Sequence, residues 1–289
     1  MLRKTKKDNG SVGQKATNAA YFTLANGEKL YYEDTATGND VLVMMHGWTS
    51  THAVYDKPVE LLKGKARCIT YDHRGHGASK DANGDHVTME TLASDLHELL
   101  VGLSLDAVTL VGWSMGAGVA MTYLEMFGTE RLRQVVLCDM TPKQLNDDEW
   151  KLGLYQGAFT AQDEANNAGK SFYQLYKEFA IGAMPKLKKV PGFLLRRPLK
   201  KRLATCDEGV LRSLSVSMKG QDHRGCFAGF DIPLSYFYAY PGSLFSPELA
   251  SWYQQNVPSS YKSVRFDDAT HMLIEEQPQK FADQLAALL

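Results

Sequence analysis

Three side chains in this sequence have the chemistry of a nucleophile, a base and an orienting acid. Ser114 lies in GWSMG, His271 lies in FDDATHMLIEE, and Asp139 ends the apolar segment QVVLCD. A serine hydroxyl is a weak nucleophile near neutral pH, and it needs a base that a third group holds in place. These residue types therefore predict acyl transfer through Ser114, provided that the fold brings the three side chains together.

GWSMG has the spacing of a nucleophile elbow, GxSxG, in which a serine projects from a sharp turn between a strand and a helix. Such a turn strains the serine backbone, and the glycines leave room for it. The surrounding run 107–124 has no charge for 18 residues, which is the length of a short membrane span. Its first half is β-branched and its second half suits a helix, so we expect a buried strand, a turn and a buried helix instead.

His271 directly follows the last predicted strand, and it is the expected base. In a parallel sheet the loops after the strands gather at one edge, where ligands bind. The turn that holds Ser114 and the loop that holds His271 therefore share an edge. The oxyanion of the reaction needs backbone N–H donors, which the sequence offers at Met115 in the turn and at Trp48 in the loop after VLVMM.

Apolar runs and helical patterns alternate, and they predict the elements that must position these side chains. YFTLANGEKLYYED predicts an antiparallel hairpin around Asn26-Gly27. Six later apolar runs predict buried strands, at 41–47, 66–72, 107–112, 134–139, 233–240 and 261–266. We therefore predict an α/β protein with a doubly wound, mostly parallel sheet of about eight strands.

This alternation stops after the sixth predicted strand and resumes near residue 230. The intervening 140–229 are helix-friendly and aromatic, and they predict a helical lid inserted after the sixth strand. The predicted organisation is a flexible N-terminal tail (1–19), a core (20–139 and 230–289) and this lid.

Composition argues against several classes of function. The 289 residues carry a formal net charge of -1, which gives no overall attraction to nucleic acid or to an anionic membrane. No apolar stretch follows the basic N-terminus, so we expect no signal peptide and a cytoplasmic location. The four cysteines have neither CxxC pairing nor metal-ligand spacing, and we expect reduced core thiols. We expect no cofactor and no metal.

Four motifs together resemble the α/β-hydrolase superfamily, and in particular its cofactor-free haloperoxidase and esterase branch. They are MHGWTS, YDHRGHGAS, GWSMG and ATHMLIEEQP, in this order along essentially the whole chain after the tail. The resemblance implies the α/β-hydrolase fold. It also implies that Asp72, Arg74 and His76 shape the fold and the rim of the site rather than catalyse. His46 and Gly47 are interpreted as residues that shape their loop.

Most of this superfamily places the acid just after the strand that follows the lid, and here that position holds Gly242 and Ser243. Three explanations compete. The acid is Asp267 or Asp268, it is absent, or it is Asp139, which ends the strand expected beside the nucleophile strand. We favour Asp139, because a carboxylate three or four residues from the histidine seldom reaches the imidazole from behind. The alternative role of Asp139 is a turn that starts the lid.

The lid segment KLKKVPGFLLRRPLKKR (186–202) carries eight basic residues and no acidic one. It suits attraction of an anionic substrate or transient contact with an acidic membrane surface. We favour a solvated lid face instead, because Pro191, Gly192 and Pro198 are expected to break any long amphipathic helix. No stable membrane insertion is expected.

The predicted function is a carboxylesterase-like serine hydrolase that cleaves a carboxylic ester or related acyl compound through an acyl-enzyme and a Ser-His-Asp triad. Trp48, Trp113 and Met115 are expected to line the substrate pocket, so the expected partner is a small ester with an apolar portion. The same triad suits C–C bond hydrolysis, lactone opening or perhydrolysis. Outside enzymes, the alternative is a non-catalytic, ligand-binding member of the fold.

Overall fold

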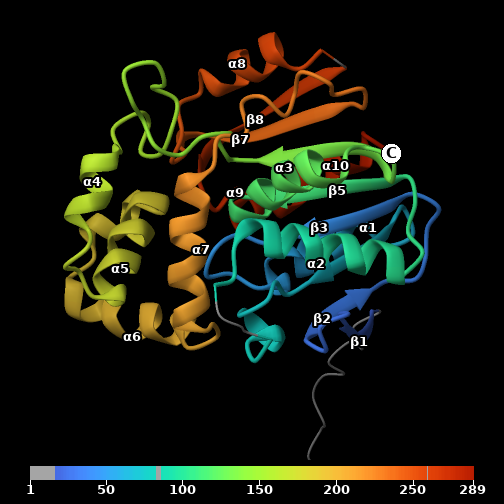
Figure 1. Cartoon of the computed structure of the whole chain (residues 1–289), viewed down its shortest axis with the longest axis horizontal. Helices are drawn as coiled ribbons and strands as arrows, with labels where there is room; N and C mark the ends of the chain where they lie inside the picture. The colour runs from blue at the N-terminus through green and yellow to red at the C-terminus, as the bar shows by residue number, and fades with distance from the viewer. Residues whose placement is uncertain (1–16, 83–85, 259) are drawn as a thin grey trace, which may run out of the picture.

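The computed structural model describes residues 17–82, 86–258 and 260–289, whose eight strands form one sheet in the order β1-β2-β4-β3-β5-β6-β7-β8 (Figure 1). The strands are β1 (Asn18–Thr23), β2 (Lys29–Asp34), β3 (Val41–Met45), β4 (Arg67–Tyr71), β5 (Val108–Trp113), β6 (Leu132–Cys138), β7 (Leu234–Gly242) and β8 (Tyr261–Thr270). β2 pairs antiparallel with β1 and β4, and all other neighbours are parallel. The predicted α/β fold is confirmed.

The predicted hairpin is the β1–β2 pair, in which Tyr21 lies opposite Tyr31. β1 begins at Asn18, so the strand starts inside the segment predicted as a tail. Residues 1–16 of that tail lie outside the described residues. At the other end of the sheet, β8 continues to Thr270, past its predicted end at residue 266.

Helices cover both faces of the sheet, as a doubly wound fold requires. Side chains that alternate along the strands enter two separate cores: Val43 and Met45 join one, and Leu42 and Met44 join the other. The first core receives α2 (Met89–Gly102), α3 (Met115–Phe127) and α8 (Leu249–Asn256). The second receives η1 (His52–Tyr55), α1 (Asp56–Leu62), α9 (Leu273–Glu276) and α10 (Pro278–Ala286). A further 3-10 helix, η2, spans Gly77–Ser79.

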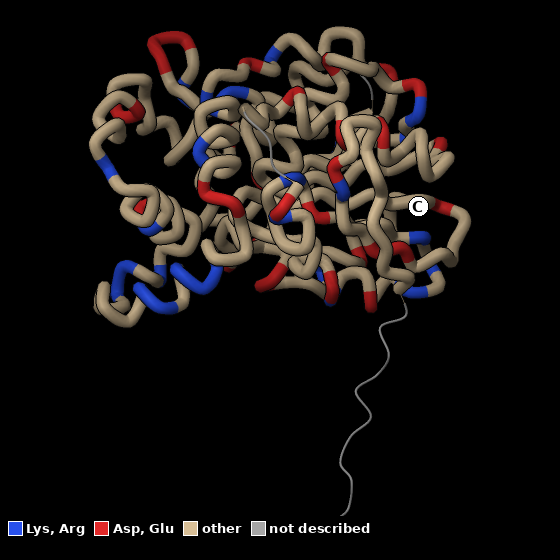
Figure 2. The backbone as a smooth tube through the Cα atoms, turned by 60° about the horizontal axis from the view of Figure 1, so that its bottom comes forward, with Lys and Arg blue, Asp and Glu red and all other residues tan. Residues whose placement is uncertain are grey.

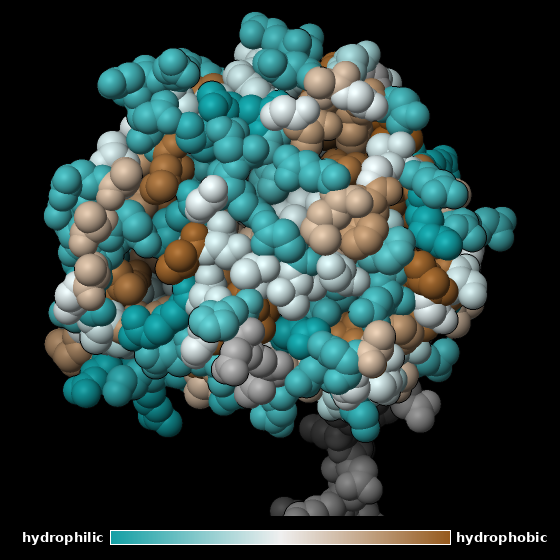
Figure 3. All heavy atoms as spheres, in the orientation of Figure 1, coloured by the Kyte–Doolittle hydropathy of each residue, from teal (hydrophilic) through white to brown (hydrophobic). Residues whose placement is uncertain are grey.

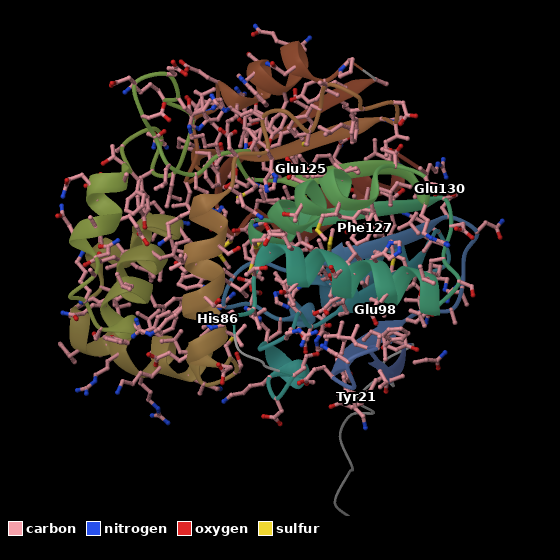
Figure 4. The ribbon with its side chains drawn as sticks, in the orientation of Figure 1. Tyr21, His86, Glu98, Glu125, Phe127 and Glu130 are labelled. Atoms are coloured by element: carbon pink, nitrogen blue, oxygen red, sulfur yellow. The ribbon has the colours of Figure 1, made fainter. Side chains whose placement is uncertain are left out.

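Polar and aromatic contacts tie these helices to their neighbours, and Figure 4 labels three of the residues involved. Glu98 of α2 accepts the backbone N–H of Ala25 at 2.6 Å, which fixes the β1–β2 turn. Phe127 of α3 stacks on His97 of α2 with ring centroids 4.1 Å apart. Glu125 of α3 lies 2.8 Å from a ring nitrogen of His223, in the segment that returns to β7.

The uncharged run 107–124 forms strand β5 and most of helix α3, as the sequence predicts. Its residues from 108 to 124 are all buried, so the absence of charge reflects a protein core. None of the described helices combines the length and hydropathy that a membrane span requires.

The chain between β6 and β7, called the insert below (residues 139–233), holds its own helices beside the sheet (Figure 1). They are α4 (Ala161–Asn166), α5 (Phe172–Ala183), η3 (Pro185–Lys189), α6 (Gly192–Leu203) and α7 (Glu208–Gly220). Thr160 and Ser171 begin α4 and α5 with capping boxes, and Asp207 caps α7 through the Val210 N–H. Residues 140–160 form turns and loops rather than helix. The role of the insert as a lid stays a prediction.

The prediction that Pro198 breaks the helix of the basic segment is wrong, because α6 runs from Gly192 to Leu203 with Pro198 inside it. A proline in a helix removes one N–H donor and leaves the carbonyl four residues earlier without a partner. That carbonyl belongs to Leu194, whose residue is 54% exposed, so water can satisfy the group.

Candidate active site

Ser114 is the single residue between β5 and α3, and its backbone adopts φ 54° and ψ -120°. A non-glycine residue with positive φ is strained, and such strain concentrates at functional sites. Its N–H donates to the Cys138 carbonyl at 2.9 Å, and its own carbonyl accepts the N–H groups of Ala117 and Gly118. These bonds hold the hydroxyl at the carboxyl end of β5.

Close backbone contacts explain the glycines around Ser114. A Cβ atom on Gly112 would collide with the carbonyl oxygen of Gly116, and one on Gly116 would collide with the carbonyl oxygen of Met45. A Cβ atom on Gly47, in the loop after β3, would lie 3.1 Å from the Cβ of Ser114. Glycine at these positions lets α3 and the β3 loop approach the turn.

His271 directly follows β8 and is 1% exposed. Its Nε2 lies 2.9 Å from the Oγ of Ser114, and its Nδ1 lies 2.7 Å from the Oδ2 of Asp139. The Nε1–H of Trp113 donates to the His271 carbonyl at 2.9 Å, and the rings of Phe179 and Phe245 pack at 6.3 and 6.1 Å. The imidazole is therefore held between a hydroxyl and a carboxylate.

Asp139 follows β6 with φ 47° and is completely buried. Besides contacting His271, its carboxylate accepts the Ala239 N–H at 3.1 Å and the Ser243 hydroxyl at 2.8 Å, both on its Oδ1. A buried carboxylate needs such partners, because an unpaired one is costly to remove from water. The structure thus brings together the three side chains that the sequence singled out.

Ser243 is a site residue whose role the sequence analysis missed. Its Oγ accepts the Phe245 N–H at 2.9 Å, so its own proton is directed to Asp139. Ser243 occupies the position after β7 where the superfamily usually has an acid. The sequence did contain a signal for this role, because a serine stands where a carboxylate is usual. Pairing Ser243 with Asp139 also required knowing that β6 and β7 are neighbouring strands.

The other candidate acids lie elsewhere. Asp267 and Asp268 are exposed, and Asp267 pairs with Arg265 at 2.7 Å. Both belong to strand β8, which continues past its predicted end at residue 266, and Asp268 is skipped in the β7–β8 pairing. Neither carboxylate forms a hydrogen bond with His271 among the described residues.

The two N–H groups predicted to bind an oxyanion flank Ser114. Met115 begins α3, and the first N–H groups of a helix have no acceptor within the helix. Trp48 lies in the loop after β3, next to Gly47, where an added Cβ atom would lie 3.1 Å from the Cβ of Ser114. The hydrogen bonds found among the described residues include none from the Trp48 backbone N–H. Both groups remain proposed oxyanion donors.

A cavity of about 520 Å³ opens from Ser114 into the insert, whose helices α4, α5 and α7 supply much of its wall. Apolar residues form one part of the lining: Trp48, Met140, Leu154, Phe172, Phe179 and Phe245. Ion pairs cross the insert's part, where Lys219 contacts Glu164 at 2.6 Å and Lys170 contacts Glu178 at 2.7 Å. The cavity suits a ligand with an apolar portion next to Ser114.

Its lining differs from the predicted pocket at two positions. Trp48 lines the cavity, and its ring packs on Phe172, Tyr176 and Phe179 of the insert. Met115 is fully buried in the core and lines neither described cavity, and Trp113 lines only a second one of about 20 Å³. The sharp turn projects Ser114 alone and directs its two neighbours to opposite sides of the sheet.

Comparison with known proteins identifies the family. A model described as the alpha/beta hydrolase fold matches residues 40–278. The chain belongs to the α/β-hydrolase fold family. The pimeloyl-[acyl-carrier protein] methyl ester esterase of Nitrosomonas europaea is 26% identical over 262 residues, covering 90% of this chain and 99% of the relative.

A second group of relatives matches this α/β-hydrolase over a shorter part of both chains. The non-heme chloroperoxidase of Kitasatospora aureofaciens is 38% identical over 162 residues, 55% of this chain and 58% of the relative. This chain thus matches little more than half of the length of such relatives.

Solved structures agree on the fold. The esterase of Exiguobacterium antarcticum superposes with a TM-score of 0.78 at 22% identity, covering 94% of this chain and 99% of that one. The bromoperoxidase of Bacillus anthracis gives 0.77 at 24% identity, with 94% and 98% covered.

In this α/β-hydrolase the YDHRGHGAS residues form buried structural contacts. Asp72 accepts the N–H groups of His52 and Ala78, both at 2.7 Å, and Arg74 pairs with Asp95 at 2.6 Å. Burial lowers the pKa of His76 to about 4, which keeps its ring neutral near pH 7. None of these side chains contacts Ser114 in the described structure.

His46 shapes the loop after β3, as interpreted from the sequence. Its Nδ1 lies 2.9 Å from the Gly47 carbonyl, and its Nε2 accepts the His73 N–H at 3.1 Å. Full burial lowers the pKa of His46 well below its usual value, so the ring is neutral and suits both bonds. The imidazole thus connects the loops after β3 and β4.

One group among the described residues has metal-ligating side chains within reach of each other: Glu33, His52 and Asp56. Although partial burial opposes it, the contact with Asp72 at 2.8 Å, together with Glu33, raises the pKa of His52. The cluster thus consists of a histidine whose ring contacts neighbouring carboxylates. The four cysteines are free thiols, and burial raises the pKa of Cys68 to about 12.

Proposed function

We propose that this protein is a carboxylesterase-like serine hydrolase that cleaves a carboxylic ester or a related acyl compound. The observation that carries the proposal is the continuous contact from Asp139 to His271 at 2.7 Å and from His271 to Ser114 at 2.9 Å. This series of contacts ends at the Ser114 hydroxyl, and Ser114 lines a cavity of about 520 Å³. Nucleophile, base and orienting acid are the parts that a serine hydrolase requires.

In the proposed first step, Nε2 of His271 takes the Ser114 proton while Oγ attacks the ester carbonyl. The Asp139 carboxylate accepts Nδ1–H and stabilises the imidazolium without taking its proton. The N–H groups of Trp48 and Met115 bind the oxyanion. The imidazolium then gives its proton to the departing alcohol, which leaves an acyl group on Ser114.

In the second step, His271 removes a proton from water as the water oxygen attacks the acyl-enzyme. Collapse of the intermediate returns the proton to Ser114 and releases the carboxylic acid. No cofactor takes part in either step. Ser243 is proposed to hold the Asp139 carboxylate in register with Nδ1 of His271.

The proposed substrate is a small ester with an apolar portion, because Phe179 and Phe245 pack near His271 on the cavity wall. The relative matched over 90% of this chain is named as a methyl ester esterase, which favours ester cleavage. The helices of the insert are proposed to act as a lid over this cavity. A cytoplasmic location of the protein remains a prediction from the sequence.

Perhydrolysis, in which hydrogen peroxide replaces water, is the second candidate, because relatives matched over half of the chain are named as chloroperoxidases. The same three side chains would form the acyl-enzyme. Lactone opening and C–C bond hydrolysis stay open on the same chemistry. Comparing hydrolysis of short and long acyl esters and lactones with peracid formation from acetate and peroxide separates them.

Labelling with a fluorophosphonate tests the nucleophile. We expect the folded protein to gain one phosphonyl group, located on Ser114 by peptide mass spectrometry, and to lose ester hydrolysis in proportion. Ser114→Ala is the matched control, and it should neither label nor turn over. A folded protein that hydrolyses no ester and does not label would instead support a non-catalytic binding role.

A further inference from the structure

The segment 186–202 concentrates positive charge on one part of the surface. The whole chain carries -1 and this segment contributes eight basic and no acidic residues, so the remaining residues carry -9. Seven of the eight cations are exposed: Lys186, Lys188, Lys189, Arg196, Arg197, Lys200 and Lys201. No described carboxylate pairs with any of the seven. Figure 2 shows them gathered at one corner of the molecule.

An apolar pair lies among these cations. Phe193 is 78% exposed and Leu194 is 54% exposed, and they are adjacent in the first turn of α6. Phe193 has the highest exposure among the large hydrophobic residues described. In Figure 3 the corner that carries α6, at the lower left, shows hydrophobic and hydrophilic side chains next to each other. Single exposed apolar residues are ordinary, but an adjacent pair between two groups of cations is a feature to explain.

The opposite side of α6 fixes the helix to the rest of the protein. Leu195 and Leu199 are each 5% exposed and belong to the first of the two cores, together with residues of α2 and α3. Arg202, the eighth cation, donates from Nε to the Thr49 carbonyl at 3.2 Å, in the loop that also holds Trp48. Because these inward contacts use one side of α6, Phe193 and Leu194 cannot turn inward without breaking them.

We propose that the outer face of α6 and η3 is a reversible docking surface for an anionic lipid membrane, with Phe193 and Leu194 entering the headgroup layer. Helices that lie on membranes combine exposed Phe and Leu with flanking Lys and Arg. Cations are attracted to the negatively charged leaflet. Apolar side chains move out of the water and insert beneath the headgroups. Here cations precede the apolar pair in η3 and follow it in α6, which matches a flat anionic layer over an apolar interior.

The continuity of α6 through Pro198 is what makes this surface possible, since a broken helix would scatter the cations. An acidic protein would satisfy the cations equally, but the position of Phe193 at the helix tip favours a lipid layer. The docking surface shares no residue with the Ser114 site. Membrane binding is measured without turnover, so it stands or falls separately from the proposed hydrolase activity.

Flotation of the full-length protein with lipid vesicles tests the proposal. We expect it to float with vesicles of equal parts phosphatidylcholine and phosphatidylglycerol and to stay behind with phosphatidylcholine alone. Raising the salt to about 1 M should release it, because the screening length falls to about 3 Å. Lys200→Glu with Lys201→Glu should abolish flotation. Phe193→Ser with Leu194→Ser should weaken vesicle binding at least about tenfold, since each side chain loses apolar burial.

Matched controls keep the result specific to α6. Lys63→Glu with Lys65→Glu makes the same charge change at exposed positions between α1 and β4, and Tyr21→Ser removes an aromatic ring that is 56% exposed on β1. Both should float like the unaltered protein, and all variants should keep their thermal unfolding and their hydrolysis of a soluble ester. Equal flotation of the Phe193/Leu194 variant would overturn the docking proposal, and so would failure of the unaltered protein to float.

Discussion

The loops that follow β6 and β7 begin side by side at one edge of the sheet, yet they contribute different groups to the same site. The β6 loop supplies the buried carboxylate of Asp139, and the β7 loop supplies the hydroxyl of Ser243, 2.8 Å away. Superfamily members usually carry the acid in the second of these loops. The difference teaches that a carboxylate on the neighbouring strand can reach the same place behind the imidazole, where Oδ2 of Asp139 lies 2.7 Å from Nδ1 of His271.

Strand order explains why the β6 loop can do this. β6 lies between β5 and β7, so Asp139 is the neighbour of both the Ser114 turn and the segment after β7. The backbone of Asp139 is left-handed, with φ 47°, where the insert begins. The carboxylate of the same residue contacts Nδ1 of His271. The turn-forming role and the proposed acid role of Asp139 are therefore compatible.

The largest expected effect comes from removing the charge of the β6 loop. Asp139→Asn should lower kcat for a short ester by about 10⁴-fold, because an amide does not stabilise the imidazolium or select its tautomer. Steady-state kinetics measure the loss, and thermal unfolding shows whether the fold persists. Comparable turnover in a folded Asp139→Asn protein would leave Asp139 with its turn-forming role alone.

Exchanging the two loops' groups tests the comparison directly. Asp139→Ser alone should be nearly inactive, whereas Asp139→Ser with Ser243→Asp should recover roughly tenfold to a hundredfold in kcat, the size of coupling between contacting residues. Ser243→Asp alone, which places two carboxylates together, is the matched control and should destabilise the protein. A double variant no faster than Asp139→Ser would mean that the β7 loop cannot present an acid to His271.

A smaller effect is expected from the supporting hydroxyl. Ser243→Ala removes a hydrogen bond to a buried carboxylate, so it should lower the free energy of unfolding by about 1.5 kcal/mol and kcat by about tenfold. Ser246→Ala is the control, because Ser246 lies in the same loop and, among the described residues, its hydroxyl accepts only the Glu248 N–H. Unchanged kcat in Ser243→Ala would limit Ser243 to a structural role.

The smallest effect is expected from the carboxylates that lie near His271 only in sequence. Asp267→Asn and Asp268→Asn should leave kcat unchanged and alter the free energy of unfolding by less than about 1 kcal/mol, because both residues are exposed. The same kinetic and unfolding measurements apply. A large loss of kcat in either variant would make that residue, rather than Asp139, the orienting acid.

Local patterns in the sequence were sufficient for the fold. Apolar runs bounded by turn residues located the strands, since a strand buried on both faces tolerates no charge. The hairpin around Asn26-Gly27 and the GxSxG turn were equally local signals. Strand ends were less certain. β8 runs past its predicted end because Asp267, Ala269 and Thr270 pair with β7, although Asp267 and Asp268 are polar and exposed.

Features that depend on distant contacts escaped prediction. Whether α6 continues through Pro198 depends on whether water can reach the Leu194 carbonyl, which the proline leaves without a helical partner. Composition does not show the exposure of that carbonyl. The cavity lining likewise depends on which way each side chain leaves the turn, and Met115 turned into the core.

By itself the sequence determined the order of the elements and the residue types able to form a site, Ser114, His271 and Asp139, because both follow from local periodicity and chemistry. It left the acid among several alternatives. Only the tertiary structure decided which carboxylate meets the imidazole and that Ser243 supports it, because the order of strands across a sheet joins residues more than a hundred positions apart.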